Sequence, residues 1–257
     1  MSRIIAIANQ KGGVGKTTTG VNLAASLAAA KRNILLVDLD PQGNATMGSG
    51  IDKQQLTYSS YDVLMNDKTA EQVIVHSEEG GYDLIPTNAD LTGAEVSLLD
   101  EMAREIRLRT ALEPIKNNYN FVFIDCPPSL NMLTVNALVA ADSVMIPMQC
   151  EYYALEGLTA LMDTIEKIRK YLNPDLKIEG LLRTMYDPRN NLATEVSSQL
   201  MEHFGEKVYR TIIPRNVRLA EAPSHGLAAM AYDKSSTGAL AYLALAGEML
   251  RREGLAA

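Results

Sequence analysis

The stretch Asn9-Gln10-Lys11-Gly12-Gly13-Val14-Gly15-Lys16-Thr17-Thr18 decides the fold, because it joins a strand-like apolar run to a helical pattern. Its glycines allow backbone N–H groups to turn inward around phosphate oxygens, and the following helix start adds a partial positive charge. Lys16 is placed to reach the terminal phosphates of a nucleotide, and the Thr17 hydroxyl to bind Mg²⁺. The stretch therefore predicts a phosphate-binding loop, and the alternative is a glycine-rich turn that binds nothing.

Apolar runs of strand length alternate with helical patterns along the rest of the chain. The predicted strands are Ile4–Asn9, Ile34–Asp38, Asp83–Pro86, Phe121–Asp125, Ser143–Met148, Ile178–Met185 and Val208–Ile213. Most are apolar at successive positions, which is typical of strands buried on both faces in a parallel sheet. The predicted helices are Thr17–Ala30, Gly93–Asn117, Leu130–Ala141, Leu155–Tyr171, Thr194–Phe204 and Thr237–Arg252. We expect a single α/β domain over residues 1–257, with a doubly wound, mostly parallel sheet and helices on both faces.

The composition narrows the class of protein. With 47% apolar and 21% charged residues among 257, the chain is expected to fold. Its two cysteines, Cys126 and Cys150, are expected to be small buried apolar residues, and three histidines share no metal-ligand spacing. No apolar run reaches the roughly 18 residues of a membrane span and no signal peptide precedes the first strand, so we expect a cytoplasmic protein.

The net charge of −7 does not by itself indicate a nucleic-acid binder. The charge is unevenly distributed, however. Residues 60–105 hold 11 acidic and 2 basic residues, a net of −9, which leaves +2 for the rest of the chain. The segment Lys207–Arg218 holds four basic residues and no acidic one. An acidic protein of this kind can still present a local basic face.

Carboxylates stand at the ends of two other predicted strands. Asp38 and Asp40 lie on the same side of an extended chain, where they repel one another unless a cation or water joins them. Asp125 follows four apolar residues, the order typical of a Walker B strand, and we expect it to hold Mg²⁺ through water. The alternative for Asp38 and Asp40 is that they cap a turn or helix.

The loop departs from the general P-loop pattern, because Gln10 stands where that pattern has glycine and Lys11 adds a second lysine. In this respect it resembles the deviant Walker A motif of the ParA/MinD family of ATPases. The resemblance implies ATP and Mg²⁺ as cofactors, with Lys16 as the intrachain lysine and Lys11 donated across a dimer to the partner's nucleotide. It also implies that Asp40 positions or activates the attacking water and that Asp38 supports the metal shell. A solvated loop lysine is the alternative for Lys11.

The segment after the last predicted strand resembles the adenine contact of this family. Pro214 would supply an apolar wall, and Asn216 would offer both a donor and an acceptor to the base edge. A plain turn is the alternative.

Residues 149–157 and 217–226 resemble the chromosomal ParA, or Soj, branch of the family. The resemblance implies an ATP-dependent sandwich homodimer on the nucleoid that binds double-stranded DNA without sequence preference. A centromere-binding partner of the ParB/Spo0J type would trigger hydrolysis. Arg189 and Arg218 match the arginines of the branch that contact DNA. The alternative is two solvated arginines, paired with Asp187 and Glu221.

Three other functions compete with a DNA-segregation ATPase. A MinD-like positioning ATPase would end in a basic amphipathic membrane helix, whereas the tail at residues 247–257 balances two arginines against two glutamates. A metabolic ATP-dependent ligase needs a small-molecule pocket that the sequence does not indicate. A protein that binds nucleotide without hydrolysing it is disfavoured by Asp40. The sequence therefore favours an ATPase that partitions DNA and does not bind membranes.

Overall fold

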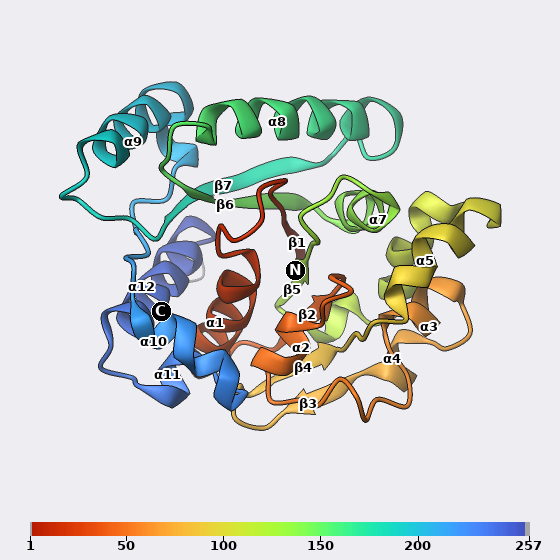
Figure 1. Ribbon diagram of the computed structural model, residues 1–257. Coiled ribbons are helices and arrows are strands. Elements are labelled where there is room, and N and C mark those ends of the chain that lie inside the picture. The colour runs from red at the N-terminus through yellow and green to blue at the C-terminus, as the bar shows by residue number, and fades with distance from the viewer. Residues whose placement is uncertain (1, 255–257) are drawn as a thin grey trace.

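A computed structural model describes residues 2–254 of the chain. Figure 1 shows a central sheet with helices packed on both of its faces. The strands are β1 (Arg3–Ile7), β2 (Ile34–Asp38), β3 (Val75–Ser77), β4 (Tyr82–Ile85), β5 (Phe121–Asp125), β6 (Ser143–Gln149) and β7 (Lys177–Thr184). They form a seven-stranded sheet in the order β3-β4-β2-β5-β1-β6-β7, in which β3 alone runs antiparallel to its neighbour. The expected doubly wound, mostly parallel α/β fold is confirmed.

Alternate residues of the strands enter two separate cores. On β1, Ile4 and Ala6 belong to one apolar cluster, and Ile5 and Ile7 belong to the cluster on the opposite face of the sheet. The longer helices are α1 (Lys16–Ala29), α7 (Met132–Ala140), α8 (Ala154–Tyr171), α9 (Asn191–Phe204) and α12 (Thr237–Arg252). Helices α7, α8 and α9 cover the first cluster, and α1 and α12 cover the second. Burial on both faces explains why these strands are apolar at successive positions.

Short helices complete the chain. They are α2 (Asn44–Gly48), α3 (Ser60–Met65), α4 (Ala70–Val73), α5 (Leu91–Ser97), α6 (Arg107–Leu112), α10 (Val217–Glu221) and α11 (Ala229–Tyr232). The single helix expected over Gly93–Asn117 is wrong, because α5 and α6 are separated by two 3-10 turns. Ala103 lies between these turns with a φ of 53°, a left-handed backbone conformation that cannot continue a helix. Strand β3 and most of the short helices were not predicted.

The last predicted strand, Val208–Ile213, is also wrong. Tyr209 and Ile213 each donate one backbone hydrogen bond to β7, to the carbonyl oxygens of Leu181 and Arg183 at 3.0 and 2.9 Å. Between them, the N–H groups of Arg210 and Thr211 bond the Glu248 carboxylate on α12 at 2.9 and 2.8 Å. The segment runs beside β7 but makes only isolated bridges with it, because the Glu248 carboxylate accepts the N–H groups that a continuous ladder would use.

The sheet order brings three carboxyl ends together. Strand β5 lies between β1 and β2, and its last residue, Asp125, pairs with Ile7 on one side and with Asp38 on the other. The loop that follows β1 leads into α1, and the segment that follows β2 leads into α2. The predicted phosphate loop and the predicted carboxylates therefore lie at one edge of the sheet (Figure 1).

Candidate nucleotide-binding site

The loop after β1 has the backbone shape that its glycines allow. Gly13 and Gly15 adopt positive φ angles of 71° and 89°, a conformation that favours glycine, and Gly15 directly precedes the first residue of α1. That first residue, Lys16, is only 6% exposed, and its Nζ donates to the carbonyl oxygen of Lys11 at 3.3 Å. Burial lowers the pKa of Lys16, although nearby carboxylates act in the opposite direction. The lysine thus lies inside the curve of the loop, where phosphate oxygens would meet it.

Val14 of the loop accepts a hydrogen bond from β7, a contact that the sequence did not predict. Thr184, the last residue of β7, donates from its hydroxyl to the carbonyl oxygen of Val14 at 2.7 Å. The Thr184 side chain is buried and also lies within 4 Å of where a Cβ on Gly15 would stand. Its position at the carboxyl end of a predicted strand was the one available indication of this role.

Thr17 and Asp125 form an oxygen site at the base of the loop. The Thr17 hydroxyl donates to Asp125 Oδ2 at 2.6 Å. The other oxygen, Oδ1, is buried and has no hydrogen-bond partner among the described residues. Burial, followed by the neighbouring charge of Asp38, raises the pKa of Asp125 well above its ordinary value. A buried carboxylate oxygen without a partner beside a threonine hydroxyl fits a hard cation such as Mg²⁺.

The two residues present do not enclose a cation by themselves. Within residues 2–254, no three His, Cys, Asp or Glu side chains are grouped so that they could hold a metal. Mg²⁺ usually keeps several waters and takes phosphate oxygens as ligands, so two protein oxygens fit an ion that arrives with a nucleotide.

Asp38 is more deeply engaged in the fold than the other carboxylates. Its Oδ2 accepts hydrogen bonds from the N–H and hydroxyl of Thr46 on α2, at 2.8 and 2.7 Å, and its Oδ1 accepts from Asp40 N–H at 3.1 Å. Burial raises the pKa of Asp38 to about 6, while these hydrogen bonds act to lower it. Asp38 therefore makes the cap-like contacts of the alternative interpretation. It lies opposite Asp125 in the sheet register, and neither residue is among those that line the cavity above the phosphate loop.

Asp40 lies at the wall of the cavity. It is 9% exposed, and its Oδ1 accepts a hydrogen bond from Gln42 N–H at 3.0 Å, which closes a turn. Asp40 lines the space above the phosphate loop together with Gln42 and Asn44. The turn contact of the alternative interpretation is present, and it leaves the carboxylate beside the cavity.

The cavity at this edge of the sheet has a volume of about 480 Å³. Of the predicted residues, it brings together Gly12, Gly13, Gly15, Lys16, Thr17, Thr18, Asp40, Pro214 and Asn216. It is also lined by residues that were not predicted, among them Thr184, Met185 and Tyr242. A cavity of this size, with a phosphate loop at one end and an apolar wall at the other, is adequate for a nucleotide.

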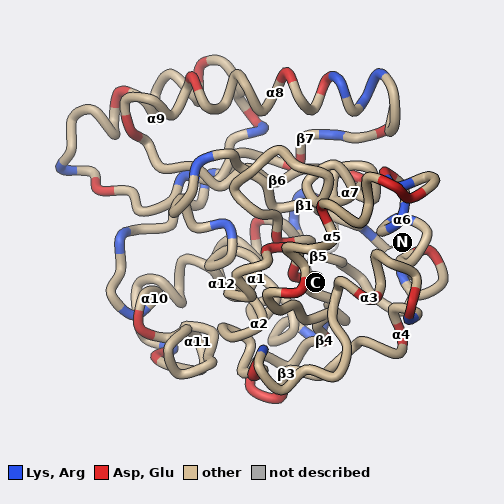
Figure 2. Tube along the Cα trace, turned by 45° about the vertical axis from the view of Figure 1, so that its right-hand side comes forward, with Lys and Arg blue, Asp and Glu red and all other residues tan. Residues whose placement is uncertain are grey.

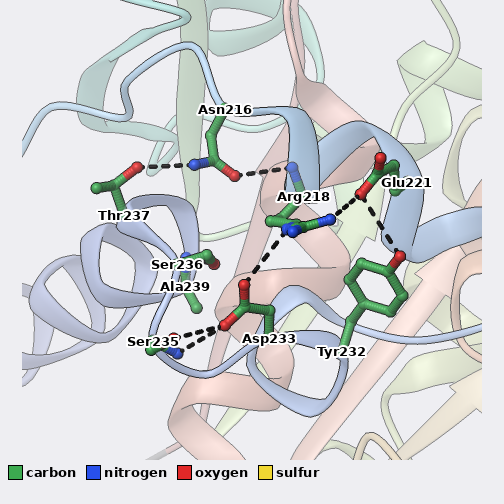
Figure 3. Close-up of polar contacts among 9 residues, drawn as sticks. All are labelled: Asn216, Arg218, Glu221, Tyr232, Asp233, Ser235, Ser236, Thr237 and Ala239. Atoms are coloured by element: carbon green, nitrogen blue, oxygen red, sulfur yellow. Dashed lines mark hydrogen bonds and ion pairs between the residues drawn. The ribbon is translucent and has the colours of Figure 1, made fainter.

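Asn216 has a structural role as well as a place on the cavity wall. Its Oδ1 accepts from the N–H of Arg218 at 2.9 Å and so caps α10, while its Nδ2 donates to the Thr237 hydroxyl at 2.7 Å (Figure 3). Both ends of the amide are therefore in use. A base edge would meet Asn216 only by sharing its oxygen, which has a second lone pair, or its second N–H.

Lys11 points away from its own loop. Its Nζ forms an ion pair with Glu151 in the segment between β6 and α8, and both side chains are close to half exposed, at 42% and 45%. Two loop lysines five residues apart thus face different surroundings, since Lys16 is buried and Lys11 lies at the rim. Glu151 was not singled out from the sequence.

The two predicted DNA-contacting arginines do not line the cavity: Arg189 is on the exposed loop before α9, and Arg218 is in the first turn of α10. Arg189 pairs with Asp187 at 2.7 Å and is 88% exposed. Arg218 pairs with Glu221 at 2.8 Å and with Asp233 at 3.4 Å (Figure 3). The pairings of the alternative interpretation are therefore present. Figure 2 shows basic positions on the segment between α9 and α10, which has one acidic residue, Glu206.

The fold and the site define a P-loop ATPase, for which ATP and Mg²⁺ are the cofactors. The family model described as an AAA domain matches residues 2–178, which contain the loop and both carboxylate strands. Among solved structures, cobyrinic acid a,c-diamide synthase from Mycobacterium smegmatis, with bound ATP analogue and magnesium, is 38% identical with a TM-score of 0.86, covering 99% of this chain and 96% of that one. The cell division ATPase MinD of Pyrococcus furiosus is 25% identical with a TM-score of 0.81, over 98% of this chain and all of that one.

Curated relatives are more similar in sequence. Soj of Bacillus subtilis is 54% identical over 97% of this chain and 98% of that protein. The chromosome partitioning protein ParA of Caulobacter vibrioides is 53% identical over 98% and 95% of the two chains. The chain belongs to the ParA/Soj family of chromosome-partitioning ATPases, as the resemblance of its loop and of residues 149–157 and 217–226 implies.

Proposed function

We propose that ATP closes two copies of this chain into a sandwich dimer, and that the dimer binds double-stranded DNA without sequence preference on the nucleoid. A centromere-binding partner of the ParB/Spo0J type then stimulates hydrolysis, which releases the dimer from DNA. Residues 1–257 act as one ATPase domain in this cycle.

The outward position of Lys11 carries the dimer proposal. A lysine that served its own nucleotide would lie in the loop beside Lys16, whereas Lys11 is paired with Glu151 at the rim of the site. From the rim it can reach a triphosphate held by a second copy. A second cation on a triphosphate with about four negative charges stabilises the closed state only when ATP is bound in both copies.

Within one copy, we assign the chemistry to residues that line or floor the cavity. The loop N–H groups of residues 11–18 and Lys16 hold the phosphates, and Pro214 and Asn216 contact the base. Thr17 and Asp125 would hold Mg²⁺, with Asp38 supporting Asp125 from behind; bound there, the ion neutralises phosphate charge. Asp40 orients the attacking water from the cavity wall.

The C-terminal helix supports DNA rather than a membrane as the surface that the dimer binds. Four large apolar residues of α12 are buried in the core that α12 shares with α1, namely Tyr242, Leu245, Met249 and Leu250. Its last basic residue, Arg252, pairs with Glu248 and stacks on the Tyr209 ring. On the outer side of α12, Leu240 and Leu243 are 53% and 37% exposed, but the basic residues of the helix begin only two turns further on, at Arg251, so this exposed pair lacks the basic flank of a membrane-binding helix. Residues 255–257 lie outside the described residues. Nor does any described helix have the length and apolarity to cross a bilayer.

One experiment tests the cycle as a whole. Gel filtration and DNA binding are measured without nucleotide, with ADP and with a slowly hydrolysed ATP analogue. We expect a monomer that binds DNA weakly in the first two states, and a dimer that binds any duplex in the third. Binding to anionic vesicles in place of DNA would support the MinD-like alternative. A monomer in all three states would contradict the proposal.

A further inference from the structure

The orientation of one peptide group in the phosphate loop depends on a residue outside the loop. Thr184 donates from its hydroxyl to the carbonyl oxygen of Val14 at 2.7 Å. A trans peptide group is planar, so the carbonyl of Val14 and the N–H of Gly15 point in opposite directions. Because the hydrogen bond fixes the carbonyl toward Thr184, it also turns the N–H of Gly15 the other way.

The residues that line the cavity indicate which side of the loop a nucleotide would meet. Gly13 and Gly15 line the cavity, whereas Val14 is not among its lining residues and is only 1% exposed. The hydrogen bond from Thr184 to the carbonyl of Val14 is itself buried. Backbone N–H groups attract phosphate oxygens, and a carbonyl oxygen in the same place would repel them. The observed orientation is therefore the one that favours phosphate binding.

The loop does not fix this orientation by itself. Gly15 has a φ of 89°, and glycine adopts positive and negative φ with similar ease, so the peptide group before it can rotate at little cost. Two other carbonyls of the loop have donors nearby in the sequence. The carbonyl of Lys11 accepts from Lys16 Nζ at 3.3 Å, and that of Gly15 accepts from Thr19 N–H at 2.9 Å. The donor to Val14 comes from β7 instead.

The end of β7 is itself held firmly enough to position the loop. Strand β7 pairs with β6 up to Thr184, which lies opposite Gln149 in the register. The preceding residue, Arg183, is 7% exposed and donates to the Ser197 hydroxyl on α9 and to the carbonyl oxygen of Tyr209, each at 2.8 Å. Strand β7 and the loop before α1 lie next to one another in Figure 1. The hydroxyl of Thr184 therefore belongs to a fixed part of the structure.

The residues after Thr184 lead to the other end of the cavity. Met185 lines the cavity with a φ of 48°, a left-handed conformation that is uncommon for residues other than glycine. The N–H of Tyr186 donates to the carbonyl oxygen of Ile213 at 3.1 Å, directly before Pro214 of the apolar wall. Strained backbone persists where the surrounding structure holds it, and it is frequent at ligand sites. The end of β7 thus contacts both the phosphate loop and the apolar wall.

We propose that Thr184 is a positioning residue for nucleotide binding. Its hydroxyl sets the Val14–Gly15 peptide group so that the N–H of Gly15 faces the phosphates, and it acts through the loop rather than on the nucleotide. Without the hydroxyl, the carbonyl of Val14 loses its donor and the peptide group can rotate. The consequence falls on ADP as well as ATP, and it requires neither a dimer nor DNA.

The first test compares two substitutions of Thr184 by calorimetric titration with ADP and with a slowly hydrolysed ATP analogue. Valine is close to threonine in shape but lacks the donor, and we expect Thr184→Val to bind both nucleotides about tenfold more weakly or worse. Thr184→Ser keeps the donor and should stay within a few-fold of the wild type. Thr164→Val is the control, because Thr164 on α8 also donates to a backbone carbonyl, that of Ala160 at 3.1 Å. Its nucleotide affinity should be unchanged.

The second test measures the loop without any nucleotide. Amide hydrogen exchange in residues 10–17 should be faster in Thr184→Val than in the wild type or in Thr184→Ser, while exchange in β6 and α9 stays as in the wild type. In steady-state ATP hydrolysis, Thr184→Val should raise KM by about tenfold or more and leave kcat within a few-fold, because the loop binds the ground state and the transition state alike.

Three results would overturn the proposal. Wild-type affinity of Thr184→Val for ADP would show that the loop holds its own orientation. Equal losses of affinity in Thr184→Val and Thr184→Ser would assign the effect to packing of the methyl group. Faster exchange throughout Thr184→Val, with a lower melting temperature, would mean that the substitution loosens the whole fold. The ADP titration keeps the test apart from the proposed partitioning cycle, since a chain that never dimerised would still show the difference between the two variants.

Discussion

Asp38 at the end of β2 lies directly opposite Asp125 at the end of β5, so two fully buried carboxylates share one register position beside the phosphate loop. Each carboxylate accepts a hydrogen bond from a threonine hydroxyl: Asp38 from Thr46, and Asp125 from Thr17. Asp38 uses both of its oxygens within the protein, whereas Asp125 keeps one oxygen without a partner among the described residues. This asymmetry distinguishes a supporting carboxylate from one that is available to a cation.

The two loop lysines should separate nucleotide binding from dimer formation. Lys16→Ala removes the buried cation of the loop and should weaken ATP binding by about 100-fold or more. Lys11→Ala should keep ATP affinity within a few-fold but lose the ATP-dependent dimer and hydrolysis. The measurements are calorimetric ATP titration and gel filtration with light scattering, with Lys167→Ala on α8 as the control. Normal dimerisation of Lys11→Ala would leave Lys11 as a rim lysine paired only with Glu151.

Asp40 should matter for turnover and little for binding. If its carboxylate orients water from the cavity wall, Asp40→Ala should bind ATP, dimerise and remain dimeric, with hydrolysis slowed by about 100-fold or more. Single-turnover hydrolysis and the lifetime of the ATP-bound dimer provide the measurement. Asp163→Ala, on the exposed side of α8, is the matched control. Hydrolysis at the wild-type rate in Asp40→Ala would transfer the role to another residue.

DNA must compete with carboxylates for both candidate arginines. Hydrogen bonds from Arg189 lower the pKa of Asp187 to about 2, so this pair stays charged at neutral pH. Arg189→Glu and Arg218→Glu should weaken binding to every duplex alike, and each lost phosphate contact should reduce the salt slope by about 0.9. Asp187→Asn should have the opposite effect, because it frees Arg189 while leaving the arginine in place.

The DNA measurement is a salt titration with the Asp40→Ala dimer as the parent, and Arg169→Glu at the surface pair with Glu166 is the control. Unchanged binding in both arginine variants would show that the proposed face is wrong. Loss of DNA binding together with loss of the dimer would place the arginines in the contact between copies.

Glu248 should stabilise the fold in a pH-dependent way. Burial acts to raise the pKa of Glu248, but its hydrogen bonds from Thr211 and Arg210 and the charge of Arg252 together lower it below the ordinary value of 4.5. A lowered folded-state pKa gives stability that is present above pH 4.5 and is lost as the pH falls through the folded-state value. Glu248→Gln should therefore lower the free energy of unfolding at neutral pH by about 1–3 kcal/mol.

The difference between the wild type and Glu248→Gln should shrink as the pH falls below 4.5. Urea unfolding at several pH values measures it, and Glu202→Gln, at an exposed position on α9, serves as the control. A difference that does not change with pH would mean that the carboxylate charge adds nothing to these contacts.

Local sequence was sufficient for the phosphate loop and the strands that meet it. Glycines at positions 13 and 15 favour the positive φ angles that the loop requires, and continuous apolar runs favour strands buried on both faces. These features act within a few residues of one another, so β1, β2 and β5 were predicted with nearly their observed bounds. Lys16, Thr17 and Asp40, which the local sequence singled out, line one cavity in the structure.

Only the tertiary structure decided the contacts between segments distant in the chain. Val208–Ile213 has the apolar pattern of a strand, but Glu248, 37 residues beyond Thr211, takes the N–H groups that a ladder would need. Thr184 donates a hydrogen bond to Val14 across 170 residues of sequence, and Lys11 pairs with Glu151 across 140. No local sequence pattern indicates either contact. The sequence by itself determined the loop, the buried strands and the class of chemistry, because each depends on neighbouring residues. Packing across the whole chain decided which side chains support the loop, which residue pairs with Lys11 and where the sheet ends.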